Sequence, residues 1–176
     1  MRRWCCEPLG TGARLIALAA FLIALAGVGG RAAAADPRGI WLVDGQVAVE
    51  LFACDDGLCG RIVGLTEPRD DSGQLKHDAR NPDPALRQRP LCGLGILSGL
   101  KPVGPDSWEG GRFYNPQDGH RYSASVHMQP DGRLTARFYL GLPVLGQSRT
   151  LVRIGDSDES RALGCVPGEM TAAAGQ

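Results

Sequence analysis

The sequence predicts an all-β fold, an up-and-down barrel of about eight short antiparallel strands with one helical turn in a long loop. The first basis is residues 107–140, where apolar and polar side chains alternate with the period of two that strands require. Two tight-turn sequences, 115–119 and 129–132, join three consecutive strands there. The second basis is the absence of any helix-length pattern elsewhere. A barrel leaves no exposed sheet edge, and a two-sheet sandwich remains the alternative.

Within the central stretch, the apolar residues of the second and third strands each fall on one face. These are Tyr122, Ala124, Val126 and Met128 in one strand and Leu134, Ala136, Phe138 and Leu140 in the next. Each strand therefore offers one apolar and one polar face, as a barrel wall requires.

The other strands are predicted from short apolar runs that end at turn residues. They cover residues 39–43, 46–53, 58–65, 91–97 and 147–154. Residues 66–89, rich in Pro, Asp, Arg and Asn, form a long loop, in which Asp83 followed by Pro84 predicts a helical turn at 83–88. Residues 101–106 and 141–146 are predicted connections. In the last strand one face carries Thr150, Val152 and Ile154, and the other carries Arg149 and Arg153.

The first 35 residues have the pattern of a secretory signal peptide. Three arginines precede an apolar run at 15–28, and small residues follow up to Ala35. The run is too short to span a bilayer comfortably, so we expect no membrane span after cleavage. The sequence therefore predicts a signal peptide at 1–35, a single barrel domain at 36–154 and a flexible tail at 155–176. It also predicts a periplasmic or secreted location.

The mature chain is mildly acidic. Residues 36–176 hold 15 basic and 18 acidic residues, a net charge of −3. No basic block is present, so we expect no nucleic-acid partner.

Four cysteines remain after cleavage, and an even number in an exported chain favours disulfides. Cys54 and Cys59 flank a turn-rich segment between two strands, which predicts a bridge across a hairpin. Cys92 and Cys165 are then the remaining pair. A metal site is the alternative, but the spacing of Cys54 and Cys59 is wider than that of usual zinc motifs. We predict no metal and no cofactor.

Short motifs lie along the chain at Trp41, Cys54 with residues 58–63, 81–83, 86–91, 93–97, 108–111, 114–116, 118–119 and Tyr122. In this order they resemble the motifs of a bacterial family of exported proteins, the domain-of-unknown-function family numbered 2147. The resemblance covers nearly all of residues 39–154 and implies a lipocalin-like barrel. It implies no activity. The chain departs from the family pattern at Gly64 and Leu151, where an aromatic residue is common, and at Phe138, where glycine is usual, so its cavity is expected to differ in size.

Candidate ligand-binding residues are few. Arg87, Arg89 and Arg112, with Tyr114, could hold a carboxylate or phosphate group at a barrel mouth. The plainer interpretation is that these arginines fix the long loop by bonding its carbonyls and the carboxylate of Asp78 or Asp83. Trp41 and Trp108 are likewise candidates for a stacking platform, with core packing or barrel closure as the plainer interpretation.

We find no catalytic signature. His77, His120 and His127 lack the spacing of a metal motif, and Ser98 does not stand in a nucleophile elbow. The leading hypothesis is a non-enzymatic barrel that binds a small, partly apolar or amphiphilic ligand or an envelope component. The alternatives are a hydrolase-like envelope enzyme that uses His120 or His127 with a loop carboxylate, and an interaction protein with a filled barrel.

Overall fold

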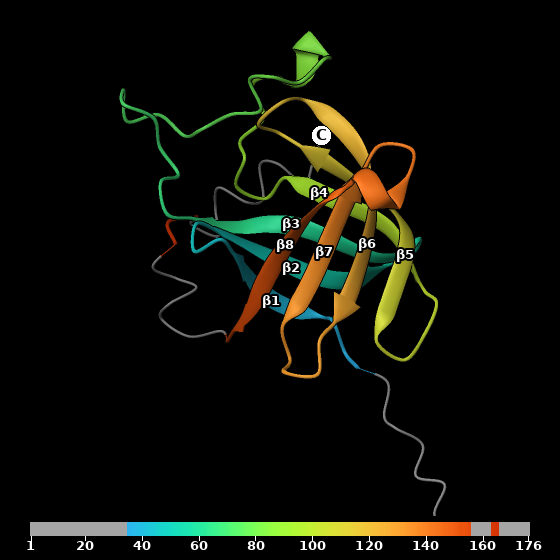
Figure 1. The fold of residues 1–176 in the computed structure, drawn as a ribbon. Coiled ribbons are helices and arrows are strands. Elements are labelled where there is room, and N and C mark those ends of the chain that lie inside the picture. The colour runs from blue at the N-terminus through green and yellow to red at the C-terminus, as the bar shows by residue number, and fades with distance from the viewer. Residues whose placement is uncertain (1–34, 156–162, 166–176) are drawn as a thin grey trace, which may run out of the picture. The chain divides into compact units, whose positions relative to one another are not determined.

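The protein is an eight-stranded closed barrel in the computed structural model, which describes residues 35–155 and 163–165 (Figure 1). The strands are β1 (Gly39–Val43), β2 (Val47–Cys54), β3 (Gly57–Leu65), β4 (Gly95–Pro102), β5 (Ser107–Asn115), β6 (His120–Met128), β7 (Leu134–Tyr139) and β8 (Gln147–Ile154). Two short 3₁₀ helices, η1 (Pro84–Leu86) and η2 (Pro143–Leu145), lie in loops. The signal peptide predicted at 1–35 lies outside the described residues apart from Ala35, as does most of the tail.

Every strand pairs antiparallel with its neighbour in sequence, and β1 pairs with β8 to close the barrel. Val43 of β1 stands opposite both Val47 of β2 and Leu151 of β8, so these three side chains share the inner face. The predicted barrel is confirmed, and the sandwich alternative is excluded because a sandwich would leave strand edges unpaired.

The predicted alternation in β6 and β7 places the expected residues inside. Ala124, Val126, Leu134 and Ala136 are buried, while the intervening residues lie at least partly in contact with solvent. Fully burying an aliphatic side chain stabilises the folded state by about 2 kcal/mol, so one buried face per strand is enough to fix the register.

Strand β4 begins and ends later than predicted. The expected strand was 91–97, with a connection at 101–106, whereas β4 runs over Gly95–Pro102. Residues 91–94 instead form a turn, in which the Leu94 N–H donates to the Leu91 carbonyl at 3.1 Å and Gly93 has φ of +85°. Pro102 ends the strand opposite Trp108, a position where a missing N–H is tolerated.

In strand β8 the inner face carries charge at both ends. Leu151 is buried, whereas Arg149 and Arg153, which share its face, are exposed at opposite ends of the barrel. The apolar side chain of Val152 points outward and is exposed. Polarity alone therefore does not identify the inner face of this strand.

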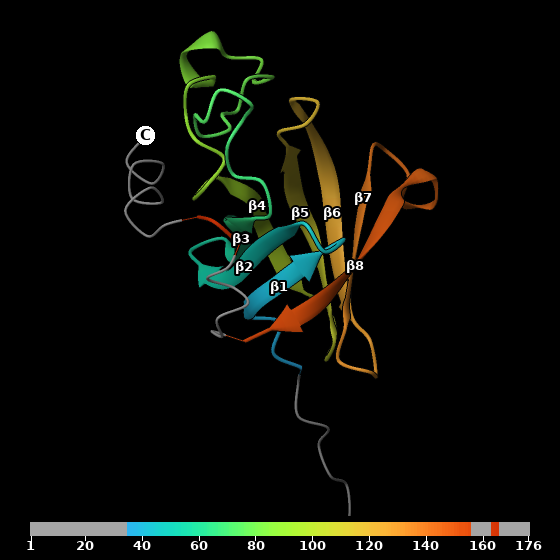
Figure 2. The same ribbon diagram turned by 90° about the vertical axis from the view of Figure 1, so that its left-hand side faces the viewer.

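The two ends of the barrel differ. The turns β1–β2 and β5–β6, the β7–β8 loop and the long loop at residues 66–94 all emerge from one end, called here the open end (Figure 2). The predicted helical turn in the long loop is confirmed as η1, where the Asp83 carboxylate accepts a hydrogen bond from the Ala85 N–H at 2.9 Å. The loop packs on the β5–β6 turn at Gly119, which has φ of +75° and lies against the Arg80 backbone.

Both predicted disulfides are formed. Cys54 and Cys59 are bridged at the β2–β3 turn, and Cys92 is bridged to Cys165 across 73 positions of sequence. Beside the second bridge, Leu163 is buried against Ala48, and its carbonyl accepts from the Leu65 N–H at 2.6 Å. The described part of the tail is therefore attached to the outside of the barrel.

The opposite end, called here the closed end, is covered by residues 35–38. Trp41 is fully buried there, and its indole N–H donates to the Pro37 carbonyl at 2.8 Å. The Arg153 guanidinium stacks over the Trp41 ring at 4.2 Å and donates to the carbonyls of Asp36 and Arg38, both at 2.6 Å.

Replacing Arg153 with alanine is expected to lower the free energy of unfolding by about 1.5 kcal/mol, because a cation–π contact and two backbone hydrogen bonds are lost together. Arg149→Ala is the matched control, since its exposed ion pair with Asp44 at 3.2 Å contributes about 0.5 kcal/mol or less. Urea unfolding of both variants measures the difference. Equal losses would contradict a special role for Arg153 in closing this end.

Candidate functional site

A cavity of about 580 Å³ opens at the open end and reaches into the barrel. All eight strands contribute residues to its lining. The apolar lining residues include Val47, Val49, Leu51, Ile62, Ile96, Leu97, Phe113, Val126, Ala136, Phe138 and Leu151. The volume lies in the range of about 300–1,000 Å³ that small-molecule sites occupy, and the predominantly apolar wall is typical of such sites.

One side of the cavity wall is aromatic. The rings of Phe113 and Phe138 are stacked with centroids 4.0 Å apart, and Tyr122 lies 6.3 Å from Phe113 at a tilt. Phe138 and Leu151, two of the three positions where the chain departs from the family pattern, line the cavity, whereas Gly64 does not. The wall can therefore contact a flat or branched apolar group through ring faces.

The mouth of the cavity is polar. Asp118 in the β5–β6 turn accepts hydrogen bonds from the Asn115 amide at 2.7 Å, the Tyr122 hydroxyl at 2.8 Å and the His120 N–H at 2.8 Å. Burial alone would raise the pKa of Asp118, but these hydrogen bonds outweigh it and hold the pKa below its ordinary value. The hydrogen bond to this carboxylate raises the pKa of Tyr122.

Across the mouth, Arg149 of β8 forms an ion pair with Asp44 of the β1–β2 turn at 3.2 Å. Both residues line the cavity, as do Gln46, Gln117 and Gln147. An apolar interior with a charged and amide-lined mouth is suited to an amphiphile whose polar group stays at the opening.

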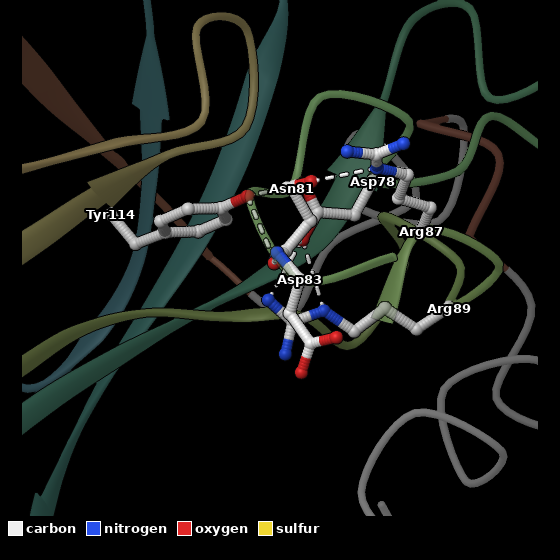
Figure 3. A network of polar contacts seen from close by, with 6 residues as sticks. All are labelled: Asp78, Asn81, Asp83, Arg87, Arg89 and Tyr114. Atoms are coloured by element: carbon white, nitrogen blue, oxygen red, sulfur yellow. Dashed lines mark hydrogen bonds and ion pairs between the residues drawn. The ribbon is translucent and has the colours of Figure 1, made fainter. Parts of the chain in front are cut away.

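Of the predicted site residues, Arg87, Arg89 and Tyr114 lie together, but on the outer face of the barrel (Figure 3). Tyr114 of β5 is buried under the long loop, and its hydroxyl donates to Asp78 at 2.6 Å. Burial, followed by this hydrogen bond to the carboxylate, raises the pKa of Tyr114.

The centre of this cluster is the fully buried carboxylate of Asp78. One oxygen accepts from the Tyr114 hydroxyl, and the other accepts from Arg89 at 2.7 and 3.0 Å and from the Asn81 amide at 2.7 Å. The Arg87 Nε–H donates to the Asn81 carbonyl at 2.8 Å. These contacts correspond to the plainer interpretation of the arginines, in which they fix the long loop.

The other candidates are spread over the barrel. Arg112 is exposed on the outer face of β5, Trp41 is buried at the closed end, and Trp108 borders a second hollow of about 300 Å³ at that end. None of the six predicted residues lines the 580 Å³ cavity. Their role in ligand binding stays a prediction.

Apart from Phe138 and Leu151, the cavity residues were not singled out by sequence reasoning. The signal that could have found them is the strand alternation, because a hollow barrel is lined by the inward half of each strand near one end. Choosing the end requires the turns that surround it, here 44–46, 116–119 and 140–146, to be assigned to the same side. Up-and-down connectivity makes that assignment possible.

The histidines named in the enzyme alternative lie near carboxylates and away from one another. His127 Nδ1 is 2.9 Å from the Ser107 hydroxyl oxygen, and that hydroxyl donates to Asp106 at 2.9 Å. The same His127 nitrogen lies 3.6 Å from the Asp106 carboxylate, and its tautomer decides whether it donates to the serine hydroxyl or accepts from it. His120 Nδ1 lies 3.5 Å from Asp118 at the cavity mouth.

Within residues 35–155 and 163–165, no group of three or more His, Cys, Asp or Glu side chains is placed to hold a metal ion. No helix of this described part is long and apolar enough to cross a bilayer.

Comparison with known proteins identifies the family. Among solved structures, the chain is similar to protein HP1028 of Helicobacter pylori, which belongs to the lipocalin family. The two share 27% identity with a TM-score of 0.62, over 78% of this chain and 97% of that one. No curated protein matches the sequence. The model of a family described as an uncharacterized protein conserved in bacteria, DUF2147, matches residues 39–153, and the protein therefore belongs to this family.

Proposed function

We propose that the protein is a non-enzymatic binding protein that holds a small apolar or amphiphilic molecule in the 580 Å³ cavity. The observation that carries the proposal is the cavity itself, because its interior is aliphatic and aromatic while its mouth is polar. Water in such an interior finds few hydrogen-bond partners, so its replacement by an apolar group is favourable.

The likeness to a lipocalin-family structure supports the same proposal, since the two chains align over 97% of that one with a TM-score of 0.62. We further propose that the protein acts outside the cytoplasm. The two disulfides support this, because such bonds persist in oxidising compartments, and so does the signal-peptide pattern at 1–35. Mass spectrometry of the purified protein tests export, with a mature chain that begins at Asp36 as the expected result.

Filling the cavity is expected to weaken binding. Ala136 of β7 is buried on the cavity wall, and Ala136→Phe places a ring in the space that the ligand would occupy. We expect the affinity for a fluorescent fatty acid, 11-dansylaminoundecanoic acid, to fall about tenfold or more, which corresponds to about 1.4 kcal/mol. Fluorescence titration measures the change.

The matched control is Ser123→Phe, which adds a ring of the same size to the outward, exposed face of β6. The control should bind the probe as the unchanged protein does. Absence of probe binding by the unchanged protein, or equal binding by both variants, would contradict the proposal. Circular dichroism and the urea midpoint show whether each variant is folded.

A further inference from the structure

The β7–β8 loop at the cavity mouth exposes four aliphatic side chains, which are called here the apolar tip: Leu140, Leu142, Val144 and Leu145. Their exposed fractions lie between 63% and 77%. Among the described residues the other large exposed aliphatic side chains are Val103 and Val152, which lie apart from the loop. Single exposed apolar residues are common on soluble proteins, but a group of four on one short loop indicates an interaction site.

Hydrogen bonds from Arg137 and within the loop hold the backbone of the apolar tip in place. Arg137 of β7 donates from Nε to the Pro143 carbonyl at 2.6 Å and from a terminal nitrogen to the Val144 carbonyl at 3.0 Å. Its other terminal nitrogen donates to the Ser148 hydroxyl at 2.9 Å. The 3₁₀ turn of η2 adds a hydrogen bond from the Gly146 N–H to Pro143 at 3.0 Å. These bonds satisfy carbonyls of the tip without water.

In an apolar environment, backbone carbonyls need hydrogen-bond donors from the protein itself. A loop that enters lipid loses the water that would bond its polar groups, and each unsatisfied group costs several kcal/mol there. A purely solvated loop has no such requirement. The arginine contacts therefore fit a loop that contacts lipid.

The charged side chains on the two strands that carry the tip are basic, while the acidic side chains of the mouth, Asp44 and Asp118, belong to the β1–β2 and β5–β6 turns. Arg137 and Arg149 lie at the base of the loop, and residues 134–154 contain no acidic side chain. Arg149 is paired with Asp44, whereas the Arg137 guanidinium donates to the Pro143 and Val144 carbonyls and to the Ser148 hydroxyl. Basic side chains around an aliphatic tip are attracted to anionic headgroups.

The tip continues into the cavity. Leu140 and Leu145 line the cavity as well as being exposed, so apolar surface extends from the loop to the interior. Figure 2 shows this loop projecting from the open end. We propose that the apolar tip docks the protein on the surface of an anionic phospholipid bilayer, with the cavity mouth turned toward the lipid. Docking on the bilayer does not depend on the proposed binding function. Exchange of an amphiphile between the cavity and the bilayer does depend on it.

Vesicle flotation of the full-length purified protein tests the docking. The vesicles contain phosphatidylethanolamine and phosphatidylglycerol, and phosphatidylcholine vesicles serve for comparison. Leu142→Thr with Val144→Thr removes two tip side chains that do not line the cavity. The matched control is Val103→Thr with Val152→Thr, which removes two exposed aliphatic side chains elsewhere.

We expect the unchanged protein and the control to float with anionic vesicles, and the tip variant to bind about tenfold more weakly. Higher salt and phosphatidylcholine should each weaken flotation. Failure of the unchanged protein to float, or equal flotation of both variants, would overturn the proposal. So would a dimer in sedimentation velocity that the tip variant alone disrupts, since a second copy would then cover the tip.

The result is separable from the proposed function. The tip variant should bind the dansyl probe in solution with unchanged affinity, and Ala136→Phe should float normally while losing the probe. If the unchanged protein floats with anionic vesicles but does not bind the probe, the cavity function is contradicted and the docking proposal is not.

Discussion

Removing the Cys92–Cys165 disulfide by replacing both residues with alanine is expected to lower the free energy of unfolding by about 4 kcal/mol. The bridge joins residues 73 positions apart, and the chain entropy that it removes from the unfolded state grows with the length of the closed loop. In the folded state it also holds Leu163 against the outside of the barrel. Urea unfolding under oxidising conditions measures the loss.

The Cys54–Cys59 bridge provides the internal control. It closes a loop with a sequence separation of only 5, for which the same relation gives about 2 kcal/mol. Replacing this pair with alanine should therefore shift the urea midpoint about half as far. If the two double variants lose equal stability, loop length does not explain the effect of the longer bridge.

Much of the fold could be predicted because local signals agree with the global arrangement. In β6 and β7 the alternation marks the inner face directly, and Ala124, Val126, Leu134 and Ala136 are buried as the pattern requires. The Asp83–Pro84 sequence likewise fixed the place of η1, since a side-chain cap and a proline act within one turn. Cys54 and Cys59 could be paired because the hairpin between them is local.

The alternation of apolar and polar residues was less informative at the two ends of the barrel. Strand β8 carries Arg149 and Arg153 on its inner face, since charges at the two ends of a short strand reach solvent although the middle is buried. In β4, glycines and a proline conceal the strand bounds, and the pairing with β3 and β5 determines them.

The candidate site was harder to predict for a related reason. Arg89 and Tyr114 were correctly grouped, but the sequence does not show which face of β5 the long loop covers. That face is decided by tertiary contacts, such as the fit of the Arg80 backbone against Gly119. The cavity depends on the sum of many side-chain volumes, which no single motif encodes.

Replacing Asp78 with alanine is expected to lower the free energy of unfolding by about 3 kcal/mol, the lower part of the range for breaking a buried ion pair. The Asp78 side chain is fully buried and Arg89 is 17% exposed, so the variant leaves a nearly buried guanidinium without its carboxylate. The Tyr114 hydroxyl and Asn81 amide lose their acceptor as well. Urea unfolding measures the loss.

Asp78→Ala should loosen the long loop more than it destabilises the barrel as a whole. The Asp78 N–H donates to the Arg89 carbonyl, and the Leu91 N–H donates to the Lys76 carbonyl, so these amides report whether the long loop stays attached. We expect their hydrogen exchange to accelerate in Asp78→Ala while amides of β6 and β7 change less. The control is Glu67→Ala, because Glu67 is 83% exposed in its pair with Lys76 and contributes about 0.5 kcal/mol or less.

A second replacement separates a structural role of Arg89 from a ligand-binding one. If the arginine only fixes the loop, Arg89→Met added to Asp78→Ala should recover part of the lost stability, because the uncompensated charge is removed. If Arg89 instead binds an anionic ligand, Asp78→Ala alone should free it and strengthen the binding of a carboxylate probe. Strengthened binding that disappears in the double variant would contradict the structural role, and recovered stability with unchanged binding would support it.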